Sequence, residues 1–222
     1  MGNPILTGQQ QQFLSLFSQN KDLVKTFYLT GGTALSEYYL FHRKSEDLDF
    51  FTEEEVEILQ IQVFLKDIQK SLHFEKVDFV TSFNRNLAYL YFPQNYILKT
   101  EFTHFPFPQI EKGTIRGGIR IDSLLDIAVN KLFTIYQKPR IRDFIDLYFI
   151  VKEKDWSLEE LAGKARIKFD WHIDYIQLGA QLLEVKNLLE VDYPVMLVDI
   201  DKNRLQQFFF EEAKKLKNKV LE

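Results

Sequence analysis

The residues of this sequence whose types and spacing most strongly indicate chemistry are two aspartates in its first quarter. Asp47 and Asp49 lie two positions apart in the segment SEDLDFF, which alternates like a strand. Residues two apart on a strand point to the same side, so the two carboxylates project together. Neighbouring carboxylates repel, and a shared divalent cation such as Mg²⁺ or Mn²⁺ is the natural way to keep both ionised. The spacing therefore predicts a metal anchor on a half-buried strand.

A glycine pair precedes this strand. A short apolar run ends at Gly31 and Gly32, a helical pattern follows, and a basic turn at residues 42–44 leads into the aspartates. Glycine removes the side chains that would block a ligand at a helix N-terminus, where free backbone N–H groups favour phosphate. Residues 27–52 thus read as strand, glycine turn, helix and strand, which places a phosphate cradle close in sequence to a metal anchor.

A later strand adds a third carboxylate. Residues 74–103 read as three strands, and in the last of them Glu101 shares a face with Lys99. Glu101 is the candidate third metal ligand. The alternative is that Lys99 and Glu101 only line a solvent face.

Charged residues also lie inside two predicted helices. Lys131 falls on or beside an apolar stripe, where it must either extend to the surface or meet an anion. In the next helix, RIRDFIDLYFIV, Asp143 and Asp146 stand one turn apart among apolar residues. Buried carboxylates need partners, and either Arg142, by i,i+4 spacing, or Lys131 could supply one. A structural ion-pair network and a catalytic role both fit this pattern.

The remaining patterns describe the scaffold. We expect a lead-in helix over residues 8–20 and a helix over about 53–70, capped by Thr52. The glycines and prolines of 104–121 indicate a connection between subdomains rather than a core element. Further helices are expected at about 122–136, 140–153, 157–168, 172–190 and 201–219, with a short strand or loop near 191–201. The predicted fold class is α+β, with a mixed sheet and flanking helices in residues 1–112 and a helical C-terminal half in residues 113–222.

Composition excludes several classes of function. The chain has 222 residues, 45% of them hydrophobic, and no cysteine, so disulfides, thiolate metal sites and a cysteine nucleophile are ruled out. A net charge of −4 argues against wholesale electrostatic coating of nucleic acid, although local basic patches exist. No stretch is long and apolar enough for a membrane span, and the N-terminus lacks a signal pattern, so a cytoplasmic protein without a membrane partner is expected.

A glycine turn at a helix start, followed by Asp-x-Asp on a strand, resembles the polymerase-beta nucleotidyltransferase superfamily. More narrowly, GGTAL, SEDLDFF and KLFTIYQKPRIRDFIDLYFI resemble the AbiEii/AbiGii toxins, the toxic half of type IV toxin–antitoxin systems. The resemblance implies metal-dependent transfer of a nucleoside monophosphate from a nucleoside triphosphate to an acceptor. It also implies an RNA acceptor, with tRNA 3′ ends among the candidates, and a cognate antitoxin protein.

The resemblance also implies roles for individual residues. Asp47, Asp49 and Glu101 are the expected metal ligands, and Asp49 or Glu101 could take the proton of the acceptor hydroxyl. Gly31, Gly32 and Thr33 are expected to cradle the phosphates, with Lys44 and Ser45 adding a cation and a hydroxyl. From the helical half, Lys131 is the expected triphosphate ligand and Asp146, with Asp143 close behind, the acidic partner or base.

Two rival interpretations compete with this one. The segment DLDFFT superficially echoes the haloacid-dehalogenase phosphohydrolases, but Phe51 stands where those enzymes have Thr or Val, and polar residues precede the strand. The second rival is a catalytically inactive nucleotide- or partner-binding module with the same fold. Loss of transfer in an Asp49→Ala variant would separate an enzyme from such a module.

Overall fold

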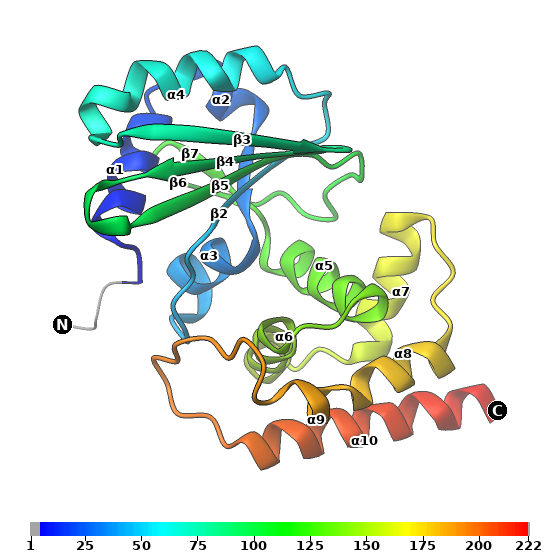
Figure 1. Ribbon diagram of the computed structural model, residues 1–222. Helices are drawn as coiled ribbons and strands as arrows, with labels where there is room; N and C mark the ends of the chain where they lie inside the picture. Colours follow the sequence, from blue (N-terminus) through cyan, green and yellow to red (C-terminus); the bar gives the residue numbers. More distant parts are fainter. Residues whose placement is uncertain (1–4, 222) are drawn as a thin grey trace. The chain divides into compact units, whose positions relative to one another are not determined.

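The structure is a computed structural model that describes residues 5–221, and its chain divides into two compact units (Figure 1). The first, here called the sheet unit, comprises Met1–Tyr39, Lys44–Pro108 and Lys112–Ser123. The second, the helical unit, comprises Leu40–Arg43, Gln109–Glu111 and Leu124–Glu222. The chain therefore passes from one unit to the other between Arg43 and Lys44, directly before the two aspartates.

The sheet unit is built on a seven-stranded mixed sheet with the order β3-β4-β5-β2-β1-β7-β6. Its strands are β1 (Tyr28–Thr30), β2 (Leu48–Thr52), β3 (Lys76–Ser82), β4 (Arg85–Tyr91), β5 (Ile97–His104), β6 (Thr114–Arg116) and β7 (Ile119–Ile121). Strand β2 runs parallel to β5 and antiparallel to β1, and β1 runs parallel to β7. The three strands predicted within residues 74–103 are confirmed as β3, β4 and β5.

Three helices of this unit are α1 (Gly8–Phe17), α2 (Lys21–Thr26) and α4 (Ile58–Leu72). Aromatic packing joins α1 and α4 to one face of the sheet, because Phe17 stacks on Phe50 of β2 at 4.3 Å and meets Phe64 of α4 edge-on. Phe50 in turn stacks on Phe102 of β5. This face therefore carries the apolar core, and the opposite face of β2 carries Asp49 and Phe51, which packs against Tyr28 and Phe105.

The helix after the glycine pair is short and changes its winding. Helix α3 (Gly31–Leu35) continues directly into the π-helical segment η1 (Ser36–Leu40), and a single 3₁₀ turn, η2 (Pro93–Asn95), precedes β5. Figure 1 shows α3 and α4 on opposite sides of the sheet. The predicted order strand, glycine turn, helix and strand is confirmed over residues 28–52.

Several element boundaries differ from the predictions. Residues 104–121 do not simply connect subdomains, because β7 pairs with β1 and buries Ile119 and Ile121, while Gly117 and Gly118, with positive φ, turn the β6–β7 hairpin. Helix α4 begins at Ile58 rather than near 53, and its cap is Glu57 instead of Thr52. Ile61 is the first residue of α4 that is buried in the core, and the helix begins about one turn before it.

The helical unit contains α5 (Leu124–Gln137), α6 (Ile141–Lys154), α7 (Leu158–Phe169), α8 (Tyr175–Leu183), α9 (Val185–Leu188) and α10 (Lys202–Leu221). Helix α5 packs against α6, α7 and α8, and α8 packs along α10. Its core includes a close stack of Phe133 on Phe169 and an edge-on contact of Phe144 with Phe209. The helices predicted here are confirmed, except that the expected helix 172–190 is split into α8 and α9.

Two short segments from earlier in the chain complete the helical unit. The amides of Ile110 and Glu111 donate to the buried Asp126, which also pairs with the buried Lys168 at 2.6 Å. His42 accepts hydrogen bonds through its carbonyl from the amides of Leu197 and Val198. The stretch 191–201 thus forms one isolated bridge, between Met196 and Arg43, rather than a strand. None of the helices within residues 5–221 is both long and apolar enough to cross a bilayer.

Candidate active site

The two aspartates of the Asp-x-Asp motif lie at the start of β2, on the face opposite the phenylalanine core. Along β2 the side chains alternate between buried and half-buried, with Leu48 and Phe50 in the core and Asp49 on the other side. Asp47, just before the strand, accepts a 2.8 Å hydrogen bond at Oδ2 from Lys99, which belongs to the same face of β5 as Glu101. Both carboxylates are half-buried. The predicted pair of carboxylates on one face is confirmed.

The glycine turn lies directly against this pair. Thr30, the last residue of β1, is opposite Asp49 in the sheet, so Gly31 begins α3 beside the Asp49 carboxylate. A Cβ atom at position 31 would lie 2.4 Å from Asp49 Oδ2, and the φ of Gly31 is +72°. Only glycine combines this backbone with this approach. The glycine turn and the Asp-x-Asp pair are therefore neighbours in space, and their roles as phosphate cradle and metal anchor stay predictions.

Thr33 has a different immediate contact from the one expected. Its side chain is fully buried, and its hydroxyl donates to the backbone carbonyl of Asp47. This bond ties the first turn of α3 to the start of β2. Gly32 is buried beside it. Thr33 thus positions Asp47 relative to the glycine turn, and phosphate binding by the turn stays a prediction.

Replacement of Gly31 with alanine is expected to lower the rate of nucleotidyl transfer by about 10²-fold, because the new methyl group displaces the Asp49 carboxylate. The left-handed backbone adds a stability cost of about 1–2 kcal/mol. Both effects are measured on one preparation, the first as transfer rate and the second by thermal unfolding.

The matched control is Gly163→Ala in α7, where an added Cβ meets no atom within 4 Å. That variant is expected to keep full activity and to gain about 0.5–1 kcal/mol of stability. Equal activity in the Gly31→Ala variant and the wild type would show that the turn tolerates a side chain and is not a close-fitting cradle.

The segment that leads into the aspartates is held by a residue that the sequence did not single out. Gln10 is fully buried, and its side-chain amide donates to the carbonyls of Ser45 and Glu46 at 3.0 and 3.1 Å. Its Oε1 accepts from the amide of Thr7 as part of a capping box on α1. The polar run QQQQ offered no signal for this role, because the partners are 35 and 36 positions away. Lys44 is exposed and Ser45 half-buried, and their roles toward a triphosphate stay predictions.

Glu101 lies beside Asp49, as expected for a third carboxylate of the site. The register of β2 and β5 pairs Asp49 with Glu101. Both Glu101 oxygens are engaged, because Arg85 of β4 donates to them at 2.7 and 2.6 Å and the Thr103 hydroxyl donates at 2.7 Å. Burial alone raises the pKa of Glu101, but these hydrogen bonds and the charge of Arg85 outweigh it and hold the pKa below its usual range. The predicted position is confirmed, and the role of metal ligand stays a prediction.

The donor set fits a magnesium ion held by two carboxylates. Among residues 5–221, no group of three or more histidine, aspartate or glutamate side chains is arranged to hold a metal. Mg²⁺ does not need such a cage, because it commonly binds one or two carboxylates and takes its other ligands from water and substrate phosphates. Asp47 and Asp49 supply two hard oxygen donors next to the glycine turn, where Asp49 Oδ2 lies directly against Gly31. Asp47 and Asp49 therefore fit the metal, whereas Glu101 is committed to Arg85.

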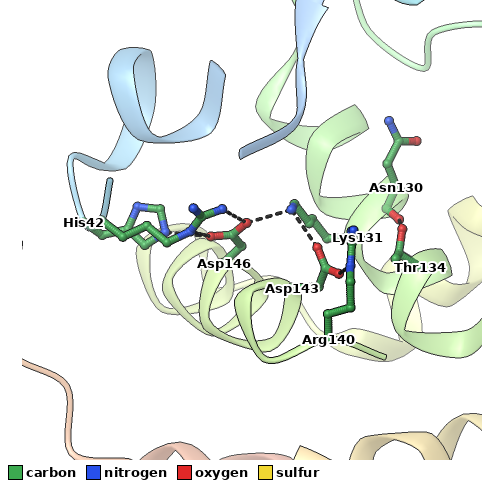
Figure 2. Close-up of polar contacts among 8 residues, drawn as sticks. His42, Asn130, Lys131, Thr134, Arg140, Asp143 and Asp146 are labelled. Carbon is green, nitrogen blue, oxygen red and sulfur yellow. Dashed lines mark hydrogen bonds and ion pairs between the residues drawn. The ribbon is translucent and has the colours of Figure 1, made fainter. Parts of the chain in front are cut away.

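A second cluster of charged residues lies within the helical unit. Figure 2 shows Lys131 of α5 between Asp143 and Asp146 of α6, with Nζ 2.7 Å from an oxygen of each. Arg140 donates to the other Asp143 oxygen at 2.7 Å. Burial raises the pKa of Asp143, but the charges of Lys131 and Arg140 outweigh it and lower the pKa below its usual range. The predicted contact of Lys131 with the aspartates is confirmed, and it includes both.

Asp146 is the centre of this cluster and is fully buried. Arg43 donates to both of its oxygens at 2.6 and 2.8 Å, and His42 Nε2 lies 2.8 Å from Oδ1 (Figure 2). Arg43 thus takes the place predicted for Arg142, whose side chain is exposed. Burial raises the pKa of Asp146, but the charges of Arg43 and Lys131 hold it well below its usual range.

These contacts bear on the role of Asp146. A carboxylate has about four acceptor positions. On Asp146, Arg43 uses two of them, and His42 and Lys131 use one each. A strongly acidic carboxyl without a free acceptor position is a poor proton acceptor. The geometry therefore favours Asp146 as the acidic partner of Lys131 over Asp146 as a general base. Binding of a triphosphate by Lys131 stays a prediction.

Comparison with known proteins shows the family and the fold of this chain. The sequence pattern described as "Nucleotidyl transferase AbiEii toxin, Type IV TA system" matches residues 14–217. An uncharacterized protein of Aquifex aeolicus is 30% identical over 192 residues, covering 85% of this chain and 86% of that protein. Two crystal structures from Helicobacter pylori share the fold. One, of a candidate nucleotidyltransferase, has a TM-score of 0.63 at 18% identity and covers 97% of both chains. The other, JHP933, has a TM-score of 0.61 at 20% identity and covers 97% of this chain and 94% of its own.

Because the family pattern spans nearly the whole chain and includes both charged clusters, the predicted resemblance is confirmed. The fold is nucleotidyltransferase-like, as expected. The chain belongs to the AbiEii nucleotidyltransferase toxin family of type IV toxin–antitoxin systems.

Proposed function

We propose that this nucleotidyltransferase moves a nucleoside monophosphate from a nucleoside triphosphate to a hydroxyl of an RNA acceptor, with the 3′ end of tRNA as the first candidate. A divalent cation, Mg²⁺ or Mn²⁺, is the proposed cofactor, and a cognate antitoxin is the proposed protein partner. The acceptor and the antitoxin rest on membership of the family. The proposals of a triphosphate substrate and a metal cofactor are supported also by residues of this chain.

The observation that carries the proposal is the contact between the glycine turn and the Asp-x-Asp strand. Asp49 Oδ2 occupies the space that a side chain at Gly31 would fill, and Asp47 is fixed to the same turn through Thr33. A triphosphate cradled by this turn would place its phosphates beside the two carboxylates. Nucleotidyl transfer requires this proximity, because charge develops on the phosphates during reaction.

The residues of the sheet unit then have separate roles. Asp47 and Asp49 would hold the cation, which when bound stabilises negative charge on the phosphates. Gly31 and Gly32 begin α3, whose N-cap residue Thr30 makes no side-chain cap hydrogen bond, and the first amides of this helix are the proposed donors to phosphate oxygens. Asp49 and Glu101 are the candidates for accepting the proton of the acceptor hydroxyl, and Glu101 would have to do so while Arg85 donates to both of its oxygens.

The proposal is tested by incubating the purified protein with total tRNA, Mg²⁺ or Mn²⁺, and each α-labelled nucleoside triphosphate in turn. We expect label to enter tRNA with at least one triphosphate and to disappear when EDTA removes the metal. A parallel sample uses tRNA whose terminal 2′,3′-diol has been oxidised with periodate. If the 3′ hydroxyl is the acceptor, this sample takes up no label.

The outcomes separate the parts of the proposal. Label in periodate-treated tRNA would move the acceptor to an internal position, and label in protein instead of RNA would replace the acceptor class. Incorporation of label that persists in EDTA would contradict the proposed requirement for a divalent cation. No incorporation with any triphosphate into either RNA or protein would contradict the proposed reaction.

A further inference from the structure

The face of the sheet opposite the phenylalanine core carries two neighbouring ion pairs that differ in geometry and in burial. Arg85 and Glu101 form a two-pronged pair, further fixed by Thr103, and the Glu101 side chain is only 6% exposed. Lys99 and Asp47 share a single 2.8 Å contact, and their side chains are 26% and 27% exposed. Paired guanidinium–carboxylate geometry is specific and strong, whereas a half-exposed lysine pair is weak and screened by solvent. The weak pair is the one that involves a proposed metal ligand.

A lysine at this position competes with a metal. Mg²⁺ binds carboxylate oxygen at about 2.1 Å, so a cation on Asp47 Oδ2 and the Lys99 ammonium at 2.8 Å from the same atom would repel each other strongly. Lys99 must leave Oδ2, or leave Asp47 altogether, for the ion to bind there. A lysine can do so without disturbing the strand, because its charge sits on a flexible four-carbon stem.

A displaced Lys99 would gain a new anionic partner when substrate is present. The neighbouring carboxylate on β5, Glu101, already feels the charge of Lys99, but both of its oxygens accept hydrogen bonds from Arg85. A triphosphate brought by the metal would supply new phosphate oxygens on the same face. Metal binding to Asp47 is therefore unfavourable on its own and favourable together with a nucleotide.

We propose that Lys99 is an internal counter-cation of the metal site, which occupies Asp47 in the free protein and transfers to a phosphate of the nucleotide when the metal–nucleotide complex binds. This inference rests on the proposed function. It makes Lys99 a residue that couples metal binding to substrate binding. The free protein then has low affinity for the metal alone.

The test compares binding rather than turnover. Mn²⁺ affinity is measured by electron paramagnetic resonance, with and without a non-hydrolysable nucleoside triphosphate analogue, for wild type and Lys99→Met. We expect Lys99→Met to bind Mn²⁺ alone about three- to tenfold more tightly, and the analogue with Mn²⁺ weaker by a similar factor. Lys99→Arg keeps the cation and is expected to resemble the wild type in the metal-only measurement.

The matched control is Lys76→Met, which removes a lysine paired with Asp78 on β3, far along the sheet order from β2. It is expected to leave both affinities unchanged. If Lys99→Met is poorly folded, Lys99→Gln replaces it, because the neutral amide also removes the charge.

The remaining outcomes are distinguishable with Asp49→Asn as a reference. If Asp49→Asn abolishes Mn²⁺ binding and Lys99→Met leaves it unchanged, the proposed metal site is supported and the proposed role of Lys99 as its counter-cation is wrong. Tighter metal binding with unchanged analogue binding would contradict the transfer of Lys99 to phosphate. If Asp49→Asn binds Mn²⁺ as well as the wild type does, the proposed metal site fails and this inference fails with it.

Discussion

Asp49→Asn is expected to lower kcat/KM for nucleotidyl transfer by about 10³-fold or more. Asparagine has nearly the shape of aspartate, so the contact with Gly31 and the fold of β2 should persist. The variant loses the negative charge that would hold the metal beside the phosphates, and metal stabilisation of such charge contributes several kcal/mol to transfer reactions. The measurement is incorporation of labelled nucleotide at saturating acceptor, over a range of triphosphate concentrations.

The control for this variant is Asp78→Asn. Asp78 is a half-exposed carboxylate of β3 that pairs with a surface lysine, Lys76, at 3.0 Å and hydrogen-bonds to Tyr91. It is expected to keep wild-type activity. An Asp49→Asn protein that unfolds like the wild type and still transfers nucleotide within tenfold of it would show that the Asp-x-Asp strand does not hold the catalytic metal.

Asp146→Asn is expected to destabilise the helical unit by about 3–5 kcal/mol. The substitution removes the negative charge between Arg43 and Lys131, whose side chains are 4% and 10% exposed, and leaves them with Asp143 as the only carboxylate of the cluster. Removing one partner of a buried ion pair leaves charge uncompensated, and the usual cost is of this size. Urea unfolding followed by tryptophan fluorescence measures it, because Trp156 and Trp171, the two tryptophans of the chain, both belong to this unit.

The pH dependence of the difference in unfolding free energy between wild type and Asp146→Asn provides a second test. The pKa of Asp146 is well below its usual range in the folded protein, so its contribution to stability is complete above the unfolded pKa, about 3.9, and is lost as the pH falls toward the folded value. The stability difference between wild type and Asp146→Asn should therefore be constant from pH 8 to pH 5 and shrink below about pH 4.

The control is Glu153→Gln, an exposed carboxylate of the same helix. It is expected to change the free energy of unfolding by less than about 0.5 kcal/mol. An Asp146→Asn protein as stable as the wild type at pH 7 would mean that the cluster is not a structural network, and would return the aspartate to the role of a catalytic base.

Local patterns account for what the sequence predicted well. Alternation over five residues was enough to place Asp47 and Asp49 on one face, and helical periodicity placed Lys131, Asp143 and Asp146 inside the helical unit. The short strand β7 was missed because three residues that follow a glycine pair carry almost no periodicity, and only pairing with β1 makes them a core element.

Contacts between distant positions account for what the sequence did not predict. Arg43 finds Asp146 across 103 positions, and Gln10 finds Ser45 across 35. For Asp146, spacing predicts the nearer Arg142, and for Gln10 the sequence predicts no partner. The engagement of Glu101 by Arg85 was hidden in the same way, because it depends on the register between β4 and β5.

Residues 40–43 belong to the helical unit although they precede the Asp-x-Asp strand in the sequence, and this affects the order in which the protein can fold during synthesis. Arg43 is synthesised about a hundred residues before Asp146, and the backbone partner Met196 comes later still. Domains generally acquire structure as the chain emerges from its N-terminal end. The strand that bears Asp47 and Asp49 is therefore made early, but the segment directly before it cannot take its final place until most of the chain has left the ribosome. A nascent or prematurely terminated chain would carry the aspartates without that anchor.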